Sequence, residues 1–166
     1  MGVFLAVYVN NSVKVANEKQ QIKSLLEFAA TEIHKKEKDA QGKINGRDNN
    51  ETVKILNLYP IDKPLLFIAL FSNDLFHQYC YPATTPLVYL KDYIISELNI
   101  INNPILSQEQ RINALYRYAN SIAHVNDLLK VSSNIIDSGG MNNEDFEQIE
   151  NELVTKNYFI PEENKK

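Results

Sequence analysis

The sequence contains no tryptophan, one cysteine and three histidines among its 166 residues. The lone cysteine, Cys80, excludes an internal disulfide, a four-thiolate zinc site and a C-x-x-C redox motif. A phosphate-binding P-loop, a G-x-G-x-x-G dinucleotide motif and a G-x-S-x-G nucleophile elbow are also missing. We therefore predict no metal and no cofactor. The balance favours a non-enzymatic protein, although the sequence leaves catalysis open.

Glycine and proline are scarce, at 5 and 6 residues, which argues against low-complexity linkers. Apolar residues make up 44% of the chain and charged residues 23%, as in an ordinary globular domain. The length suits one hydrophobic core, so we expect a single domain over residues 1–166. The formal net charge of −4 repels phosphate backbones, and we therefore expect no nucleic-acid partner.

The first nine residues, MGVFLAVYV, are almost wholly apolar and have no lysine or arginine before them. They are too short to span a bilayer and lack the basic region of a signal peptide. We predict a core strand over 3–9 and no membrane span. The alternative is the end of a removed membrane anchor. A single cysteine suits the reducing cytoplasm, while the anchor alternative implies an extracytoplasmic domain.

Two β-rich segments, 52–59 and 65–71, flank a turn that contains Pro60 and Pro64. Neither proline suits the middle of a sheet, so the pattern predicts an antiparallel hairpin over 52–71. A second hairpin, 3–9 with 12–16, joins this β-region unless a helix begins directly after Asn11. The sequence thus predicts an α+β fold: a helix-rich single domain with a small antiparallel β-region and a C-terminal helical set.

The remaining apolar pattern is helical. Residues 17–38 show three- and four-residue spacing, and the polar stretch 35–51 reads as a flexible surface loop. Thr85-Pro86 is typical of a helix start, and Ser107 with Gln110 forms a capping box that opens a helix over 108–136. Gly139-Gly140 ends that helix. An acidic helix over 143–156 and a solvated tail over 161–166 follow.

Two residue pairs are candidates for chemistry. His77 and Cys80 stand three apart, and a histidine beside a cysteine can generate a thiolate nucleophile. Arg117 and His124, in RYANSIAH, lie two helical turns apart. This stretch resembles the Arg–His motif of the small helical ribonucleases of the HEPN type, although Tyr118 follows the arginine where the family has a polar residue. The resemblance implies metal-independent RNA cleavage with Arg117 and His124 as catalytic residues.

The helix over 108–136 carries a seam with alternating steps of three and four, the spacing that pairs helices. Its members are Ile112, Leu115, Ala119, Ile122, Asn126 and Leu129. Asn126 stands where an apolar residue is expected, so it either bridges a neighbouring element or marks an assembly surface. By elimination we predict an interaction module, adaptor or chaperone-like accessory protein that binds a protein partner through an apolar surface, with a homo-oligomer as an alternative. A metal-independent ribonuclease and a sensor or assembly domain of a membrane-anchored protein are the other hypotheses.

Overall fold

The computed structural model describes residues 2–139 and 147, and these residues contain helices and no strand. The predicted α+β fold is therefore wrong, because the described chain is all-helical. Its helices are α1 (Gly2–Ile44), α2 (Asn49–Leu58), α3 (Leu65–Leu70), α4 (Asp74–Cys80), α5 (Thr84–Ile101) and α6 (Gln108–Ser138). The predicted acidic helix over 143–156 and the tail over 161–166 lie outside the described residues, apart from Glu147.

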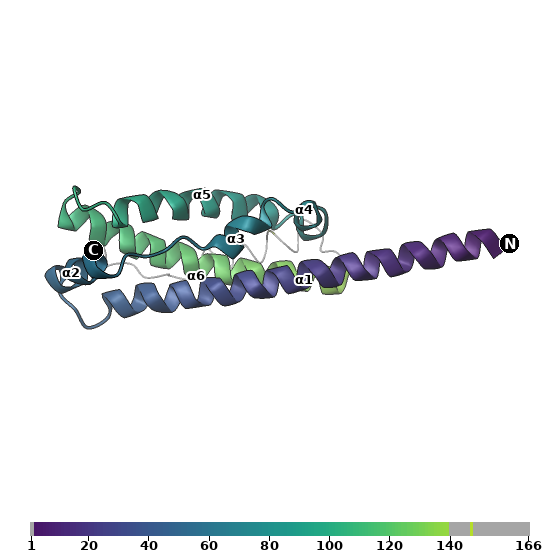
Figure 1. Cartoon of the computed structure of the whole chain (residues 1–166), viewed down its shortest axis with the longest axis horizontal. Helices are drawn as coiled ribbons and strands as arrows, with labels where there is room; N and C mark the ends of the chain where they lie inside the picture. The colour runs from purple at the N-terminus through teal and green to yellow at the C-terminus, as the bar shows by residue number, and fades with distance from the viewer. Residues whose placement is uncertain (1, 140–146, 148–166) are drawn as a thin grey trace.

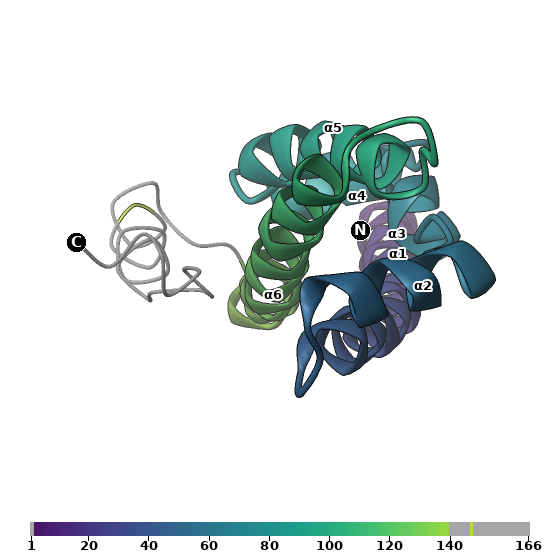
Figure 2. The ribbon, with the colours of Figure 1, turned by 90° about the vertical axis from the view of Figure 1, so that its left-hand side faces the viewer.

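Three long helices, α1, α5 and α6, build the bundle. Helix α6 packs against both α1 and α5 and runs antiparallel to them (Figure 1). The end-on view shows α5 and α6 on one side of the bundle and α2, α3 and α1 on the other (Figure 2). The short helices α2 to α4 belong to the connection from α1 to α5, and this connection also covers part of the core.

Helix α1 is far longer than the predicted 17–38. Ile33, Ala40 and Ile44 are buried at steps of seven and four, so the seam of the first helix continues through the predicted loop. The prediction of a loop over 35–51 is corrected by this seam: the helix runs to Ile44, a short connection follows, and α2 begins at Asn49. Asp48 starts α2 by accepting a hydrogen bond from the backbone N–H of Glu51 at 2.8 Å.

The predicted strands also prove to be helical. Segments 3–9 and 12–16 belong to α1, and the hairpin over 52–71 is replaced by α2, an extended connection and α3. Thr52 and Leu56 are buried four residues apart, and Phe67 and Leu70 three apart, which is helical spacing. A short apolar run has no polar residues whose positions would reveal helical spacing. The β-branched residues therefore favoured a strand, which is wrong.

The second half of the chain follows its predicted boundaries closely. Helix α5 covers the segment predicted from Thr85-Pro86 and ends at its C-cap, Asn102. Ser107 and Gln110 form the predicted capping box at the start of α6, and Gly139 ends α6 with a φ of 83°. These signals are local side-chain-to-backbone bonds, which is why they can be recognised without tertiary information.

Helix α6 carries two apolar seams rather than one. Beside the predicted seam runs a second buried row at steps of three and four: Arg111, Ala114, Tyr118, Ser121, Val125, Leu128, Ser132 and Ile135. Together the two rows give α6 a wide buried face, as its packing against both α1 and α5 requires. Arginine, tyrosine and serines interrupt the second row, and these polar types concealed it in the sequence.

Two polar side chains fix the connection between α2 and α3. The Asn102 amide accepts a hydrogen bond from the Ile61 N–H at 3.2 Å and donates one to the Ile61 carbonyl at 2.8 Å. Arg111, which is 3% exposed, donates to the Ile101 carbonyl at 2.7 Å and to Asn57 at 2.8 Å. The ends of α2, α5 and α6 are thereby tied together, and the connection is bonded at Ile61 to the end of α5.

Candidate functional site

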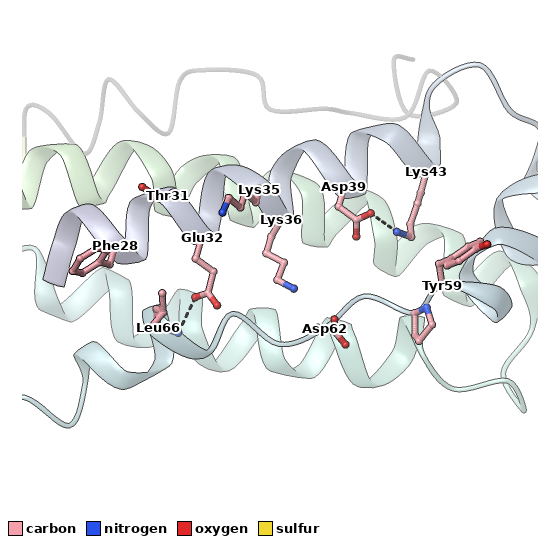
Figure 3. A pocket seen from close by; sticks show the side chains of 11 residues that line it. Phe28, Thr31, Glu32, Lys35, Lys36, Asp39, Lys43, Tyr59, Asp62 and Leu66 are labelled. Atoms are coloured by element: carbon pink, nitrogen blue, oxygen red, sulfur yellow. Dashed lines mark hydrogen bonds and ion pairs between the residues drawn. The ribbon is translucent and has the colours of Figure 1, made fainter. Parts of the chain in front are cut away.

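A groove of about 680 Å³ lies between α1 and the connection that precedes α3 (Figure 3). Helix α1 supplies one wall from Phe28 to Lys43, and residues 59–66 supply the other. The wall on α1 is about 22 Å long, given the helical rise of 1.5 Å per residue. The lining residues are Phe28, Thr31, Glu32, Lys35, Lys36, Asp39, Lys43, Tyr59, Pro60, Asp62 and Leu66.

Two of the three acidic side chains in the groove are already paired. Glu32 accepts hydrogen bonds from the backbone N–H groups of Leu66 at 2.8 Å and Phe67 at 3.0 Å, which satisfies two donors at the start of α3. Asp39 forms an ion pair with Lys43, whose side chain is only 8% exposed. Glu32 therefore joins the two walls, whereas the Asp39–Lys43 pair lies within α1.

Within the part of the chain that the structure describes, the charged groove residues outside these contacts are Lys35 and Lys36 on α1 and Asp62 on the connection. Figure 3 shows Lys36 extending from α1 toward the opposite wall. Over all of its lining residues, the groove holds three lysines and three acidic residues, so its formal net charge is zero. The groove is thus less acidic than the chain as a whole, whose formal charge is −4.

Large apolar side chains stand exposed at both ends of the groove. Phe28 and Leu66 lie at one end and are 61% and 51% exposed, and Tyr59 lies at the other end and is 67% exposed. Leu65 and Leu58, next to these residues in the chain, are 67% and 71% exposed. A cluster of apolar side chains around a groove is typical of a surface that binds a partner. The sequence held one clue, because Phe28 interrupts the polar face of the first helix.

The Arg117–His124 pair lies on α6 and does not line the groove. Arg117 donates two hydrogen bonds to Glu97 of α5, from Nε at 3.0 Å and from Nη2 at 2.9 Å. Glu97 is 4% exposed, and its hydrogen bond raises the pKa of the Arg117 guanidinium. A bidentate pair occupies the fork of donors with which arginine grips a phosphate. His124 is partly buried two turns further along α6, and Tyr118 between them is a core residue.

The His77–Cys80 pair lies on the short helix α4. Cys80 is fully buried, and this burial raises the pKa of its thiol to about 12. The thiol is then protonated at neutral pH, whereas nucleophilic attack requires the thiolate. The His77 ring is exposed and its Nε2 lies 3.2 Å from the Phe71 carbonyl. This arrangement does not activate a cysteine nucleophile.

The predicted interaction seam of α6 lies in the bundle. Five of its six members are buried: Ile112, Leu115, Ala119, Ile122 and Leu129. Asn126 is partly exposed, at the edge of the buried face. An assembly role for these residues stays a prediction, but within one chain four of the five apolar members, all except Ile112, already pack into the hydrophobic core.

Comparison with known proteins finds no matching protein-family model, no matching curated protein and no matching solved structure. Over the part of the chain that the structure describes, no three histidine, cysteine or acidic side chains gather closely enough to hold a metal ion. Within the same residues, none of the helices combines the length and the apolar character needed to cross a membrane. The groove between α1 and residues 59–66 is the feature on which a functional argument can rest.

Proposed function

We propose that the protein is a non-enzymatic interaction module whose groove binds a peptide segment of a protein partner. The observation that carries the proposal is the set of exposed apolar side chains, Phe28, Leu66 and Tyr59, around a groove whose two walls are joined by Glu32. Monomeric proteins seldom leave such side chains clustered without a use. This function also suits the buried thiol of Cys80 and the occupied donor fork of Arg117, because neither group is needed for binding.

The chemistry of the groove defines the segment that fits it. A length of about 22 Å accommodates about six to seven residues of extended peptide, at about 3.3 Å per residue. Apolar side chains at both ends of the peptide would cover Phe28 with Leu66 and Tyr59 with Pro60. An acidic residue between them would pair with Lys35 or Lys36. The partner segment is therefore amphipathic, with apolar ends and an acidic centre.

Selection from a displayed library of random twelve-residue peptides tests the proposal on the full chain. We expect the selected peptides to share two apolar positions that flank an acidic one. The Phe28→Ser/Leu66→Ser variant should bind them at least tenfold more weakly, because two half-buried contacts of about 1 kcal/mol each are lost. Lys36→Glu should remove the preference for an acidic centre. Affinities can be measured by fluorescence anisotropy.

A matched control is the Tyr89→Ser/Ile105→Ser variant. These side chains are 72% and 91% exposed but do not line the groove, so the control should bind the selected peptides as the unchanged protein does. Equal losses in the two double variants, or peptides without an apolar–acidic–apolar pattern, would contradict the proposal.

A further inference from the structure

The first part of α1 extends beyond the rest of the bundle. Figure 1 shows this helix continuing past the ends of the other described helices, and we call its residues 2–17 the arm. Glu18, just past the arm, accepts a hydrogen bond from the Tyr79 hydroxyl of α4 at 2.8 Å, and from residue 11 onward the first buried core residue is Ile22. From Gly2 to Ile22 the helix rises about 30 Å. Every residue from 11 to 17 is exposed.

The composition of the arm is unlike that of the helix surfaces in the bundle. Residues 3–9 read VFLAVYV, seven consecutive apolar positions. Since an α-helix turns 100° per residue, seven positions cover every direction around its axis. A helix on the surface of a soluble protein shows one apolar stripe and one polar face, whereas a helix that is apolar all round is buried in a large core or in a membrane.

The charge content of the arm also differs from that of a helix on the surface of a soluble protein. The chain has 21 acidic residues, yet residues 2–17 contain none, and their single charged residue is Lys14. Lys14 is 75% exposed at the side chain and lies 3.7 Å from Glu18, just past the arm. Asn10, Asn11 and Ser12 form a polar zone between this lysine and the apolar segment. This order, from apolar to amide and hydroxyl to ammonium, matches the order from acyl chains to headgroups in a bilayer.

Pairing of two arms fits these residues less well than lipid does. Helices that pair need apolar residues at steps of three and four. Such a row exists in the arm, formed by Ala6, Val9, Val13 and Ala16, but it follows one side of the helix, and a partner seated on it would leave the other sides of the apolar segment 3–9 uncovered. Lipid acyl chains require no stripe, because they surround a helix on all sides.

We propose that the arm inserts residues 3–9 into one leaflet of a lipid bilayer and holds the helical bundle at the membrane surface. Residues 3–9 make up about 10 Å of helix, about a third of the thickness of the hydrocarbon core, which fits within one leaflet. The proposal is independent of the groove, which lies further along α1 and is lined from Phe28 onward.

Vesicle flotation of the full chain tests the proposal, with vesicles of phosphatidylcholine and phosphatidylglycerol at a ratio of 3:1. We expect the unchanged protein to float with the vesicles. Val7→Asp should lower the floated fraction about tenfold or more, because an unpaired carboxylate would have to enter the acyl region. The matched control, Ile105→Asp, changes a side chain that is 91% exposed on the bundle and should float like the unchanged protein.

A fluorescent label separates insertion from self-association. In a Cys80→Ser background, a cysteine introduced by Leu5→Cys and labelled with the polarity-sensitive dye NBD should shift its emission to the blue only when vesicles are added. The same label introduced by Ile105→Cys should not respond. A blue shift without vesicles, accompanied by a concentration-dependent dimer in light scattering that Val7→Asp abolishes, would establish pairing of arms and overturn the lipid proposal. Failure of the unchanged protein to float would overturn it as well.

Discussion

The two parts of α1 share one secondary structure and have opposite surroundings. From Ile22 onward the helix buries a regular row of apolar side chains against the bundle: Ile22, Leu26, Ala29, Ile33, Ala40 and Ile44. In the arm, by contrast, residues 11–17 are all exposed, although Val13 and Val15 are as apolar as the residues in the core. Val15 stands seven residues before Ile22, on the same side of the helix as the buried row. Val15 is exposed because the arm continues past the ends of the other described helices, so the extent of the bundle, and not the spacing of apolar residues, separates the two parts of α1 (Figure 1).

The largest effect that tests this contrast is expected when one side chain is truncated in each part of α1. Ile33→Ala should lower the free energy of unfolding by about 3 kcal/mol, because Ile33 is fully buried and its removal leaves a cavity. Val15→Ala should change stability by less than about 0.5 kcal/mol, since Val15 is 43% exposed and alanine favours the helix. Urea unfolding followed by circular dichroism measures both values.

The same contrast reverses an expectation from the sequence. A core strand over 3–9 predicts that Val7→Asp unfolds the protein, whereas an arm outside the bundle predicts that Val7→Asp leaves the melting temperature unchanged. A stability loss in Val15→Ala as large as that in Ile33→Ala would mean that the arm folds onto the bundle, and the two parts of α1 would then not differ in kind.

A smaller effect is expected at the ion pair between α5 and α6. Arg117→Ala should cost about 2 kcal/mol, because it leaves the buried carboxylate of Glu97 without its partner, while the partly exposed arginine limits the loss. The Glu97→Gln/Arg117→Met variant should recover part of this loss, since no unpaired charge remains. Thermal unfolding of the two single variants and the double variant measures the coupling.

A test for ribonuclease activity shows whether Arg117 has a catalytic role in addition to its ion pair with Glu97. We expect no metal-independent cleavage of single-stranded or structured RNA in the presence of EDTA. Cleavage that disappears in both Arg117→Ala and His124→Ala, while the double variant at Glu97 and Arg117 remains folded and inactive, would support the ribonuclease hypothesis instead of the interaction module.

The sequence predicted the second half of the fold much better than the first. Ser107, Gln110 and Gly139 determine the ends of α6 through their own side chains or backbone freedom, so no distant contact is needed to read them. Helix α2 has a local signal as well, the Asp48 N-cap, but the β-branched residues of the segment favoured a strand. Helix α3 has no side-chain cap, and it begins where Glu32, more than thirty residues away, accepts its first N–H groups. The groove depends on this long-range contact and on the Asn102–Ile61 bonds, which is why the sequence could not predict it.

The smallest expected effect concerns Asn126, the one polar member of the predicted seam on α6. In contrast to its five buried neighbours in the seam, Asn126 is partly exposed, so its amide can reach water without leaving the bundle. Asn126→Leu should therefore raise the melting temperature by about 1–2 °C through added apolar contact, and the mass from light scattering should stay that of the unchanged protein. Asn113→Leu on the exposed side of α6 is the matched control and should change neither value. If Asn126→Leu instead changes the oligomeric state over a concentration series, while Asn113→Leu does not, Asn126 limits helix pairing in the way that a single polar residue sets the partner number of a coiled coil. The exposed edge of α6 would then be an assembly surface. The contrast between α6, whose apolar seam is buried within one chain, and the exposed arm of α1 would no longer hold.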